Sequence, residues 1–202
     1  MKTFITLVLL ILSVNSFGSS IHYDIDRKMH VLTGKIVKED VDDMIEYFEH
    51  VKGDRELKGS YLRLDSEGGS LYASFEMAKI IRNYGINTFV DTRCSSACTT
   101  LFLGGVNRIV TKTAEMRYHY AYIADESDYK EKGVNTLLMY GQALTFDLMA
   151  HYFKYVESED PAYLTQYLKE VFRATTPESL QTANNYKLVR TGIVTFVYEG
   201  AE

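Results

Sequence analysis

Tryptophan is absent from this chain of 202 residues, and only two prolines and two cysteines occur in it. No stretch is rich in proline, glycine and serine together, so the sequence contains no evident linker, internal repeat or low-complexity tract. Basic residues are outnumbered, because 22 Lys and Arg stand against 27 Asp and Glu, and the formal net charge is −5 at pH 7. Nucleic acids and anionic lipids bind to basic faces. We therefore expect neither of them as a partner.

Long apolar runs are rare as well, and the one that stands out lies at the N-terminus. Lys2 precedes an almost unbroken apolar run, Phe4–Val14, and Ser16 and Gly18 then occupy the −3 and −1 positions of a cleavage site before Ser19. A basic start, an apolar segment and small residues at the cut are typical of a secretory signal peptide. The alternative is a retained membrane anchor, but the run is much shorter than the ~20 residues that span a bilayer.

These features predict a signal peptide over residues 1–18 and a mature chain, residues 19–202, that is exported to the periplasm or secreted. The mature chain is long enough for one domain with a sizeable core, and no change of composition divides it.

Strand-like and helix-like patterns alternate over much of that domain. Apolar and β-branched runs predict strands at 30–37, 60–64, 86–90 and 107–111, and helical patterns predict helices at 38–53, 71–85 and 97–105. This order is typical of βαβ units around a mostly parallel sheet, so it predicts an α/β fold. Because such crossovers are right-handed, the turns that lead from strand to helix should lie at one edge of the sheet.

The C-terminal part of the chain is predicted to be mainly helical. A long helix that is apolar on more than one side is expected over Val134–Val156. Asp160 and Pro161 match the N-cap and first residue of another helix, and a similar pattern begins at Thr176. A closing strand is expected within residues 192–198.

Two of the expected strand-to-helix turns contain residues suited to nucleophilic catalysis. Gly68 and Gly69 leave the N–H groups of one turn unobstructed, and Ser96 lies where another turn enters a helix. A nucleophilic serine needs a base within hydrogen-bond reach and N–H donors aimed at the developing oxyanion. His119 could be that base, and the amides of Gly68 or Gly69 and of Ala97 could be the donors. The alternatives are a serine that only caps its helix and an ordinary strand histidine.

The same segments resemble a known protein family. The stretches "LTGKI", "LRLDSEGGSLYASFEMAKII", "CSSACTTLFLGG" and "RYH" follow one another as in the Clp protease proteolytic subunit (ClpP) and its relatives. The resemblance covers roughly residues 30–120, with a fainter match in "TTPESLQTANNYKLV". An exported branch of the family carries the same Cys-x-Ser-Ala-Cys-Thr, and signal peptide peptidase A is a more distant exported relative.

The resemblance implies a ClpP/crotonase-like α/β fold, with C-terminal helices that build homo-oligomers in the family. It assigns the nucleophile to Ser96 rather than Ser95, and the catalytic histidine to His119. The implied substrate is a peptide or a protein. No cofactor follows from the resemblance, and an ATPase partner is not expected outside the cytoplasm.

Two positions depart from the family pattern. Glu67 replaces the usual proline before the glycine pair and adds a negative charge beside the expected oxyanion site. The third catalytic residue should shortly precede "TTPES", but no acid is found directly there, and Glu170 is the nearest. Glu170 could orient His119, a backbone carbonyl could do so instead, or the site could be slow or inactive. A Ser–Lys dyad with Lys112 or Lys79 is a further alternative.

Cys94 and Cys98 flank the two serines and allow three interpretations. A disulfide is the default for two cysteines in an exported chain, and a spacing of four can meet the required Cα–Cα distance of roughly 4.4–6.8 Å. Two buried thiols could instead act as apolar fillers. Two cysteines without a nearby histidine are too few ligands for a metal, so no metal site is expected. The disulfide is favoured, and its small loop would lock the turn that holds Ser96.

Together, these observations predict an exported serine hydrolase, a peptidase in which Ser96 attacks, His119 transfers the proton and Glu170 orients the histidine. The alternative is an inactive ClpP-like domain that binds a peptide or partner protein in the same cleft. A crotonase-type acyl-CoA enzyme is a third possibility, which the absence of a basic patch for the phosphates of coenzyme A disfavours.

Overall fold

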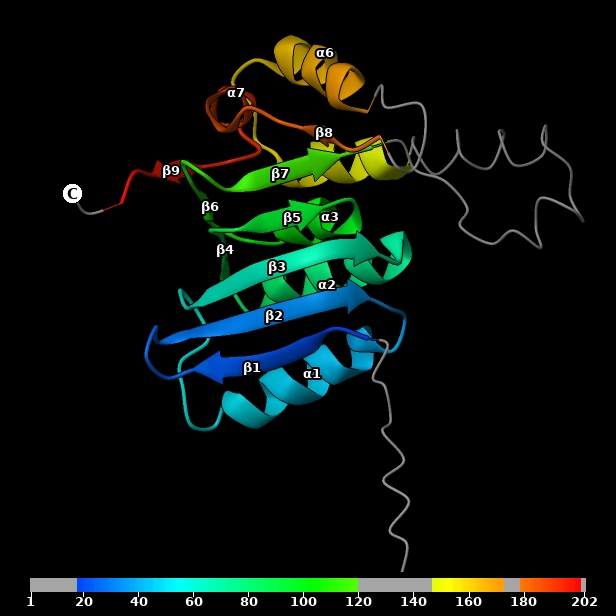
Figure 1. Cartoon of the computed structure of the whole chain (residues 1–202). Helices are drawn as coiled ribbons and strands as arrows, with labels where there is room; N and C mark the ends of the chain where they lie inside the picture. The colour runs from blue at the N-terminus through cyan, green and yellow to red at the C-terminus, as the bar shows by residue number, and fades with distance from the viewer. Residues whose placement is uncertain (1–17, 120–146, 173–178, 201–202) are drawn as a thin grey trace, which may run out of the picture.

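The computed structural model describes residues 18–119, 147–172 and 179–200. Nine strands occur in these ranges: β1 Ser20–Asp24, β2 Met29–Ile36, β3 Tyr61–Gly69, β4 Asn87–Val90, β5 Arg93–Ser95, β6 Arg108–Thr111, β7 Glu115–Tyr118, β8 Gln181–Thr182 and β9 Phe196–Tyr198. They form one curled sheet (Figure 1). All strand pairs are parallel except β1 with β2 and β7 with β8, which are antiparallel. The prediction of an α/β chain with a mostly parallel sheet is confirmed.

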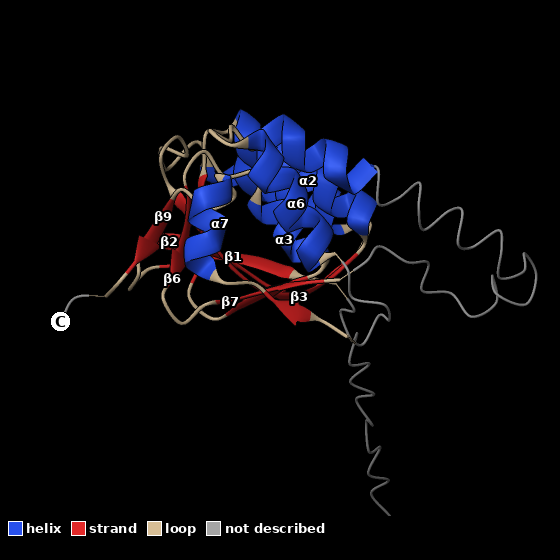
Figure 2. Cartoon of the chain, turned by 90° about the horizontal axis from the view of Figure 1, so that it is seen from above, coloured by secondary structure: helices blue, strands red, loops and turns tan. Residues whose placement is uncertain are grey.

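Helices gather on one side of this sheet (Figure 2). They are α1 Asp40–Val51, α2 Leu71–Asn83, α3 Ala97–Phe102, α6 Pro161–Val171 and α7 Asn185–Thr191, and residues 147–155 are helical as well. No helix within the described ranges is both long and apolar enough to cross a membrane. The expected signal peptide lies outside the described residues apart from Gly18, and so does most of the helix expected over Val134–Val156.

Strand β3 lies at the centre of the sheet and divides it. Its first half pairs with β4, through Tyr61–Arg63, and its second half pairs with β5, through Ser66 and Cys94. The order β4-β6-β9 continues from the first half, and β5-β7-β8 continues from the second. Because β3 ends beside β5, the glycine pair at the end of β3 lies next to the entrance of α3.

The core lies between the sheet and the helices. Met44 and Phe48 of α1 and Met77 and Ile81 of α2 are buried there. Periodicity predicted these two helices, but it also placed Ile45 on the buried face of α1, and the structure leaves this side chain 42% exposed. One stripe of α1 is sufficient to cover the adjacent strands, so its flank remains in solvent.

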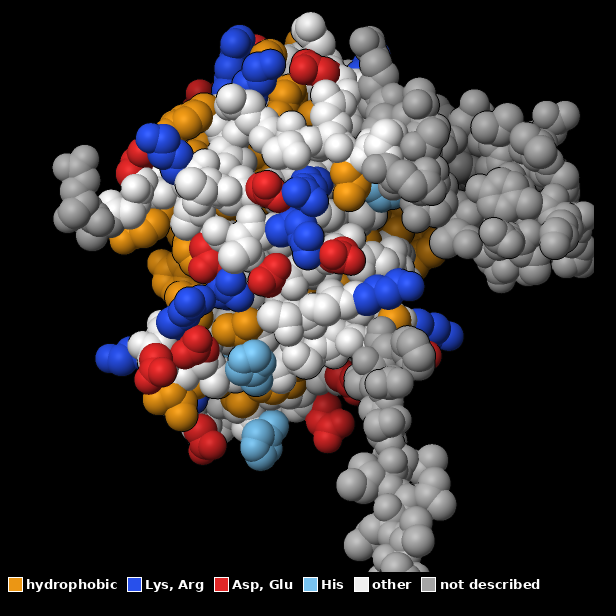
Figure 3. Space-filling model, viewed as in Figure 1, with side chains coloured by type: hydrophobic (Ala, Val, Ile, Leu, Met, Phe, Trp, Pro, Cys, Tyr) orange, Lys and Arg blue, Asp and Glu red, His pale blue; other side chains and the backbone are white. Residues whose placement is uncertain are grey.

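The other face of the sheet carries polar side chains, because successive residues of a strand point to opposite faces. Along β3, Leu62, Leu64 and Ser66 point toward the helices, while Arg63 and Asp65 alternate with them. Acidic and basic side chains are interspersed on the face seen in Figure 3. Arg63 forms ion pairs there with Asp65, at 3.7 Å, and with Asp91, at 2.6 Å.

Three local expectations were wrong. The stretch 91–96 was expected to be a turn, but it contains β5, and β3 continues to Gly69 through the expected turn after Leu64. The helix pattern beginning at Thr176 does not continue, because residues 181–182 form β8 and α7 begins at Asn185. Both β5 and β8 are very short, and such strands depend on pairing with neighbours rather than on their own propensity.

Candidate active site

Ser96 connects β5 to α3 in an unusual backbone conformation. Its φ is 55° and its ψ is −128°, a region that residues other than glycine rarely adopt. Its N–H donates to the carbonyl of Arg117 in β7, at 2.9 Å. The side chain forms no cap hydrogen bond with α3. Ser96 is therefore not the helix-capping serine of the alternative interpretation, and its hydroxyl is available for another partner.

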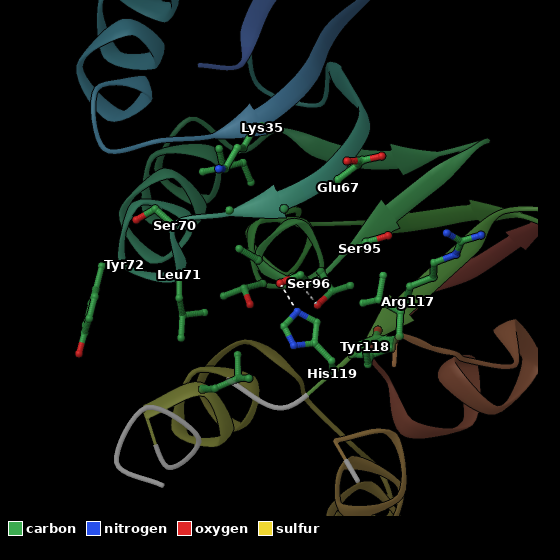
Figure 4. A pocket seen from close by; sticks show the side chains of 18 of the residues that line it. Lys35, Glu67, Ser70, Leu71, Tyr72, Ser95, Ser96, Arg117, Tyr118 and His119 are labelled. Atoms are coloured by element: carbon green, nitrogen blue, oxygen red, sulfur yellow. Dashed lines mark hydrogen bonds between the residues drawn. The ribbon is translucent and has the colours of Figure 1, made fainter. Parts of the chain in front are cut away.

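That partner is His119, which directly follows β7. Its Nε2 lies 2.7 Å from Ser96 Oγ, although the two residues are 23 positions apart in the chain (Figure 4). The histidine is 9% exposed. Parallel pairing of β5 with β7 brings Ser95 opposite Arg117, so the residues that follow these strand positions come together at one edge of the sheet. The structure thus brings the predicted nucleophile and base into direct contact.

A chain of hydroxyl groups fixes the carbonyl of Ser96. Thr99 donates to this carbonyl twice, from its N–H at 2.9 Å and from its Oγ1 at 2.8 Å. Tyr152, which is fully buried, donates its OH to Thr99 Oγ1 at 3.1 Å. Burial raises the pKa of Tyr152 above the ordinary range, so this phenol remains a protonated donor at neutral pH. Sequence patterns did not identify Thr99 or Tyr152, although Thr99 lies at the i+3 spacing at which a hydroxyl can reach back to Ser96.

The glycine pair approaches Ser96 closely. A Cβ added at Gly68 would lie 2.7 Å from Ser96 Cβ and 2.8 Å from the nitrogen of Ala97, and φ of Gly68 is 93°. The N–H of Gly68 donates to Ser66 Oγ at 3.0 Å, so it is already engaged. The N–H of Ser70 donates to Ile36 of β2 at 2.8 Å. Since N–H groups alternate between the two edges of a strand, the N–H of Gly69 is directed to the other edge, where β5 lies.

Ala97 is the first residue of α3. The N–H of a first helical residue has no partner within its own helix and is directed outward along the helix axis. Of the three N–H groups considered as donors, those of Gly69 and Ala97 therefore remain suitable for an oxyanion beside Ser96. Gly68 contributes to the site because it has no side chain that would occupy the space next to the serine.

Cys94 and Cys98 form a disulfide with a Cα–Cα distance of 5.3 Å. The bond links the middle of β5 to α3 and closes a loop around Ser96. The favoured interpretation of the cysteines is therefore confirmed. Because Cys94 points toward α3, its neighbour Ser95 points to the opposite face, away from Ser96 (Figure 4). Ser95 Oγ is buried and has no hydrogen-bond partner in the described part of the chain.

Glu67 points away from Ser96 (Figure 4). It alternates with Ser66 and Gly68 along β3, and its carboxylate forms an ion pair of 2.9 Å with Nη2 of Arg93. The negative charge that the sequence placed beside the expected oxyanion site is therefore turned outward and paired.

Glu170 is not brought to the histidine. It lies in the last turn of α6, half exposed, with its Oε1 3.8 Å from Nζ of Lys187. The two lysines of the alternative dyad are also elsewhere, because Lys79 pairs with Glu76 at 2.6 Å and Lys112 with Glu199 at 3.9 Å. Neither lysine lines the cavity described next.

A cavity of about 880 Å³ opens beside Ser96 and His119. Its apolar wall is formed by side chains of several elements, Leu71, Tyr72, Leu148, Phe172 and Leu180. Among the described residues, its charged lining consists of Lys35, Lys38, Arg93, Arg117 and Glu67. Within the described part of the lining, basic side chains thus outnumber acidic ones, although the chain as a whole is acidic.

No protein-family model matches the chain, and a search of the curated proteins finds no similar sequence. Within the described ranges, no three histidine, cysteine or acidic side chains lie close enough together to hold a metal ion.

Proposed function

We propose that this chain is an exported serine hydrolase with a ClpP/crotonase-like fold, and that it cleaves peptide bonds in the cavity beside Ser96. The observation that carries the proposal is the 2.7 Å contact between Ser96 Oγ and His119 Nε2. A serine that only capped α3 would turn its hydroxyl to the helix, whereas this hydroxyl meets a histidine that directly follows strand β7. The strained backbone of Ser96 agrees with the proposal, since such strain clusters at functional sites.

In the proposed reaction, Ser96 Oγ attacks the carbonyl carbon of the substrate while His119 Nε2 accepts the hydroxyl proton. The carbonyl oxygen becomes an oxyanion, which accepts hydrogen bonds from the amides of Gly69 and Ala97. His119 then gives its proton to the departing amine, and the C–N bond breaks. Water, deprotonated by the same histidine, hydrolyses the resulting ester and releases Ser96.

The cavity lining favours a particular substrate class. The lining combines two exposed lysines, Lys35 and Lys38, with apolar side chains such as Leu71 and Phe172. A peptide that places an apolar residue in the cavity and an acidic residue near the lysines would match this distribution. We therefore expect an ester with a succinyl group to be cleaved faster than its uncharged acetyl analogue, and charge reversal at both lysines to remove the preference.

One observation favours a second candidate, a domain that binds peptide without cleaving it. Glu170, the acid expected to orient His119, pairs with Lys187 instead. Removal of the orienting acid costs about 10⁴ in the rate of a serine protease that depends on it. The inactive domain would use the same cavity and the same lysines.

Labelling with a fluorophosphonate distinguishes the two candidates, because the probe phosphonylates an activated serine and leaves a folded binding domain unlabelled. We expect the purified mature protein to be labelled, and Ser96→Ala and His119→Ala to remain unlabelled. Ser95→Ala is the matched control, because Ser95 is adjacent, its hydroxyl is buried, and its side chain points away from Ser96 and His119. Absence of labelling in folded wild-type protein would support the binding domain.

A further inference from the structure

A buried carboxylate on α1 lies at the start of the predicted mature chain. Asp40 is 3% exposed. Its two oxygens lie 3.1 and 3.2 Å from the backbone nitrogen of Ser19, and Oδ2 also accepts a hydrogen bond of 2.8 Å from the N–H of Val37. Within the described residues, no lysine or arginine forms an ion pair with Asp40. Burial of a carboxylate without a cation costs free energy, because the charge loses its hydration. Buried charges in proteins are therefore normally paired.

Before the chain is cut, the nitrogen of Ser19 belongs to a peptide bond and cannot satisfy both oxygens of Asp40. A backbone amide has one proton, and that proton is shared here between two oxygens. An α-ammonium group at the same nitrogen has three protons and a positive charge. It would give each oxygen its own proton and would supply the missing cation.

Gly18 also fits this arrangement. A Cβ at this position would lie 2.7 Å from Asp40 Oδ1 and 3.0 Å from Val37 Cγ2. A larger residue before Ser19 would therefore press on the side chains of Asp40 and Val37, whereas glycine leaves both in place. A small residue at this position is also what a signal peptidase requires before its cut.

We propose that Asp40 is a binding site for the α-ammonium group that is created when the chain is cut between Gly18 and Ser19. In this step water adds across the Gly18–Ser19 peptide bond, the carboxylate leaves on Gly18, and the nitrogen of Ser19 takes up a proton. The buried ion pair then fixes the start of β1 to α1. Processing thereby completes the fold as well as releasing the leader.

The proposed ion pair is connected to the cavity through Val37. Val37, whose N–H is held by Asp40, lines the cavity beside Ser96. The inference rests on the predicted cleavage site and on the geometry at Asp40. It does not depend on hydrolysis by Ser96, so either proposal can fail without the other.

The first measurement is the N-terminal residue of the protein recovered after export, which we expect to be Ser19; any other first residue overturns the proposal. The second compares thermal unfolding of a chain that begins at Ser19 with one that begins at Ser16, in which an amide replaces the ammonium. We expect the longer chain to unfold roughly 2–4 °C lower, the range for one lost interaction in a domain of this size. Equal midpoints would also overturn the proposal, and this comparison requires no substitution at Asp40.

A double-mutant cycle then assigns the effect to Asp40. In Asp40→Asn the difference between the two chains should vanish, because the amide offers no charge to the ammonium. In Asp42→Asn, an exposed acid of the same helix, the difference should persist. A difference that persists in Asp40→Asn would show that the extra residues, rather than the ion pair, change the stability.

Discussion

Arg93 and Glu67 form an ion pair of 2.9 Å, and the side chain of Glu67 is directed away from Ser96. The two residues belong to adjacent strands, and each directly neighbours a residue that lies against Ser96 or α3. From the sequence alone, the negative charge of Glu67 is expected beside the oxyanion site. The ion pair with Arg93 holds this charge away from that site.

Removal of Arg93 should therefore weaken the proposed activity. In Arg93→Ala the carboxylate of Glu67 loses its partner, and its field at the oxyanion site increases. Because Glu67 is largely exposed, solvent screens this effect, and we expect the rate of fluorophosphonate labelling to fall only about two- to fivefold. Glu67→Gln in the same background should restore the rate. An unrestored rate would mean that Arg93 acts through packing.

Gly68 should be far more sensitive to substitution than another glycine of similar conformation. In Gly68→Ala the new Cβ would meet Ser95, Ser96 and Ala97 at 2.5–2.8 Å, and we expect the free energy of unfolding to fall by about 2–4 kcal/mol. Labelling should fall at least tenfold, because the clash displaces Ser96 itself. Gly59 has a φ of 80° but nothing within 4 Å of its Cβ position. Gly59→Ala should cost only ~1 kcal/mol and leave labelling unchanged. Urea unfolding and labelling rates measure both effects.

The disulfide should matter more for labelling than for stability. The bond between Cys94 and Cys98 closes a very short loop, so chain entropy predicts a contribution of at most about 2 kcal/mol to the free energy of unfolding. It also holds the turn on which the conformation of Ser96 depends. We expect the double variant Cys94→Ala, Cys98→Ala to remain folded near room temperature but to be labelled at least fivefold more slowly. Equal labelling rates would show that β5 and α3 hold Ser96 without the bond.

His151 should make the stability of the protein dependent on pH. Burial lowers the pKa of His151 to about 4, and its ring lies 4.6 Å from those of both Phe75 and Tyr155. The unfolded chain takes up a proton near pH 6.5, whereas the folded chain does so only near pH 4. The stabilising contribution is therefore present above pH 6.5 and is lost as the pH falls toward 4, by up to about 3 kcal/mol.

The variant His151→Phe keeps the ring contacts and removes the titration. Its free energy of unfolding should decline less between pH 7 and pH 4.5 than that of the wild type. Part of the dependence should remain, since burial also lowers the pKa of His30 to about 4. The control is His50→Phe at the exposed end of α1, and a profile of His151→Phe that matches the wild type would contradict the prediction.

Regular periodicity explains which parts of the fold could be predicted. The helices α1 and α2 follow the spacing of their apolar residues, and β2, β4 and β6 follow β-branched runs. In contrast, β5 consists of three residues, of which Arg93 and Ser95 are polar, and only pairing with β3 and β7 makes it a strand. Such pairing joins segments distant in sequence, and no local pattern reports it.

The site could be predicted only in part, because some of its contacts also join segments that are distant in sequence. Ser96 was suggested by its place where a strand leads into a helix, and the resemblance to the ClpP family assigned the roles of nucleophile and base to Ser96 and His119. Tyr152 lies 53 residues from Thr99, and its hydrogen bond depends on how a distant helix packs. Glu170 was chosen as the nearest acid in sequence, but its place at the exposed end of α6 turns it to Lys187.

The measurement that tests the central claim most directly is the site of modification after reaction with diisopropyl fluorophosphate. The folded protein is digested, and the phosphorylated peptide is sequenced by mass spectrometry. We predict a single adduct on Ser96, formed in wild-type protein and in Ser95→Ala but absent from His119→Ala. An adduct on Ser95 or another serine, or labelling of Ser96 at an equal rate in His119→Ala, would contradict the proposal that His119 activates Ser96.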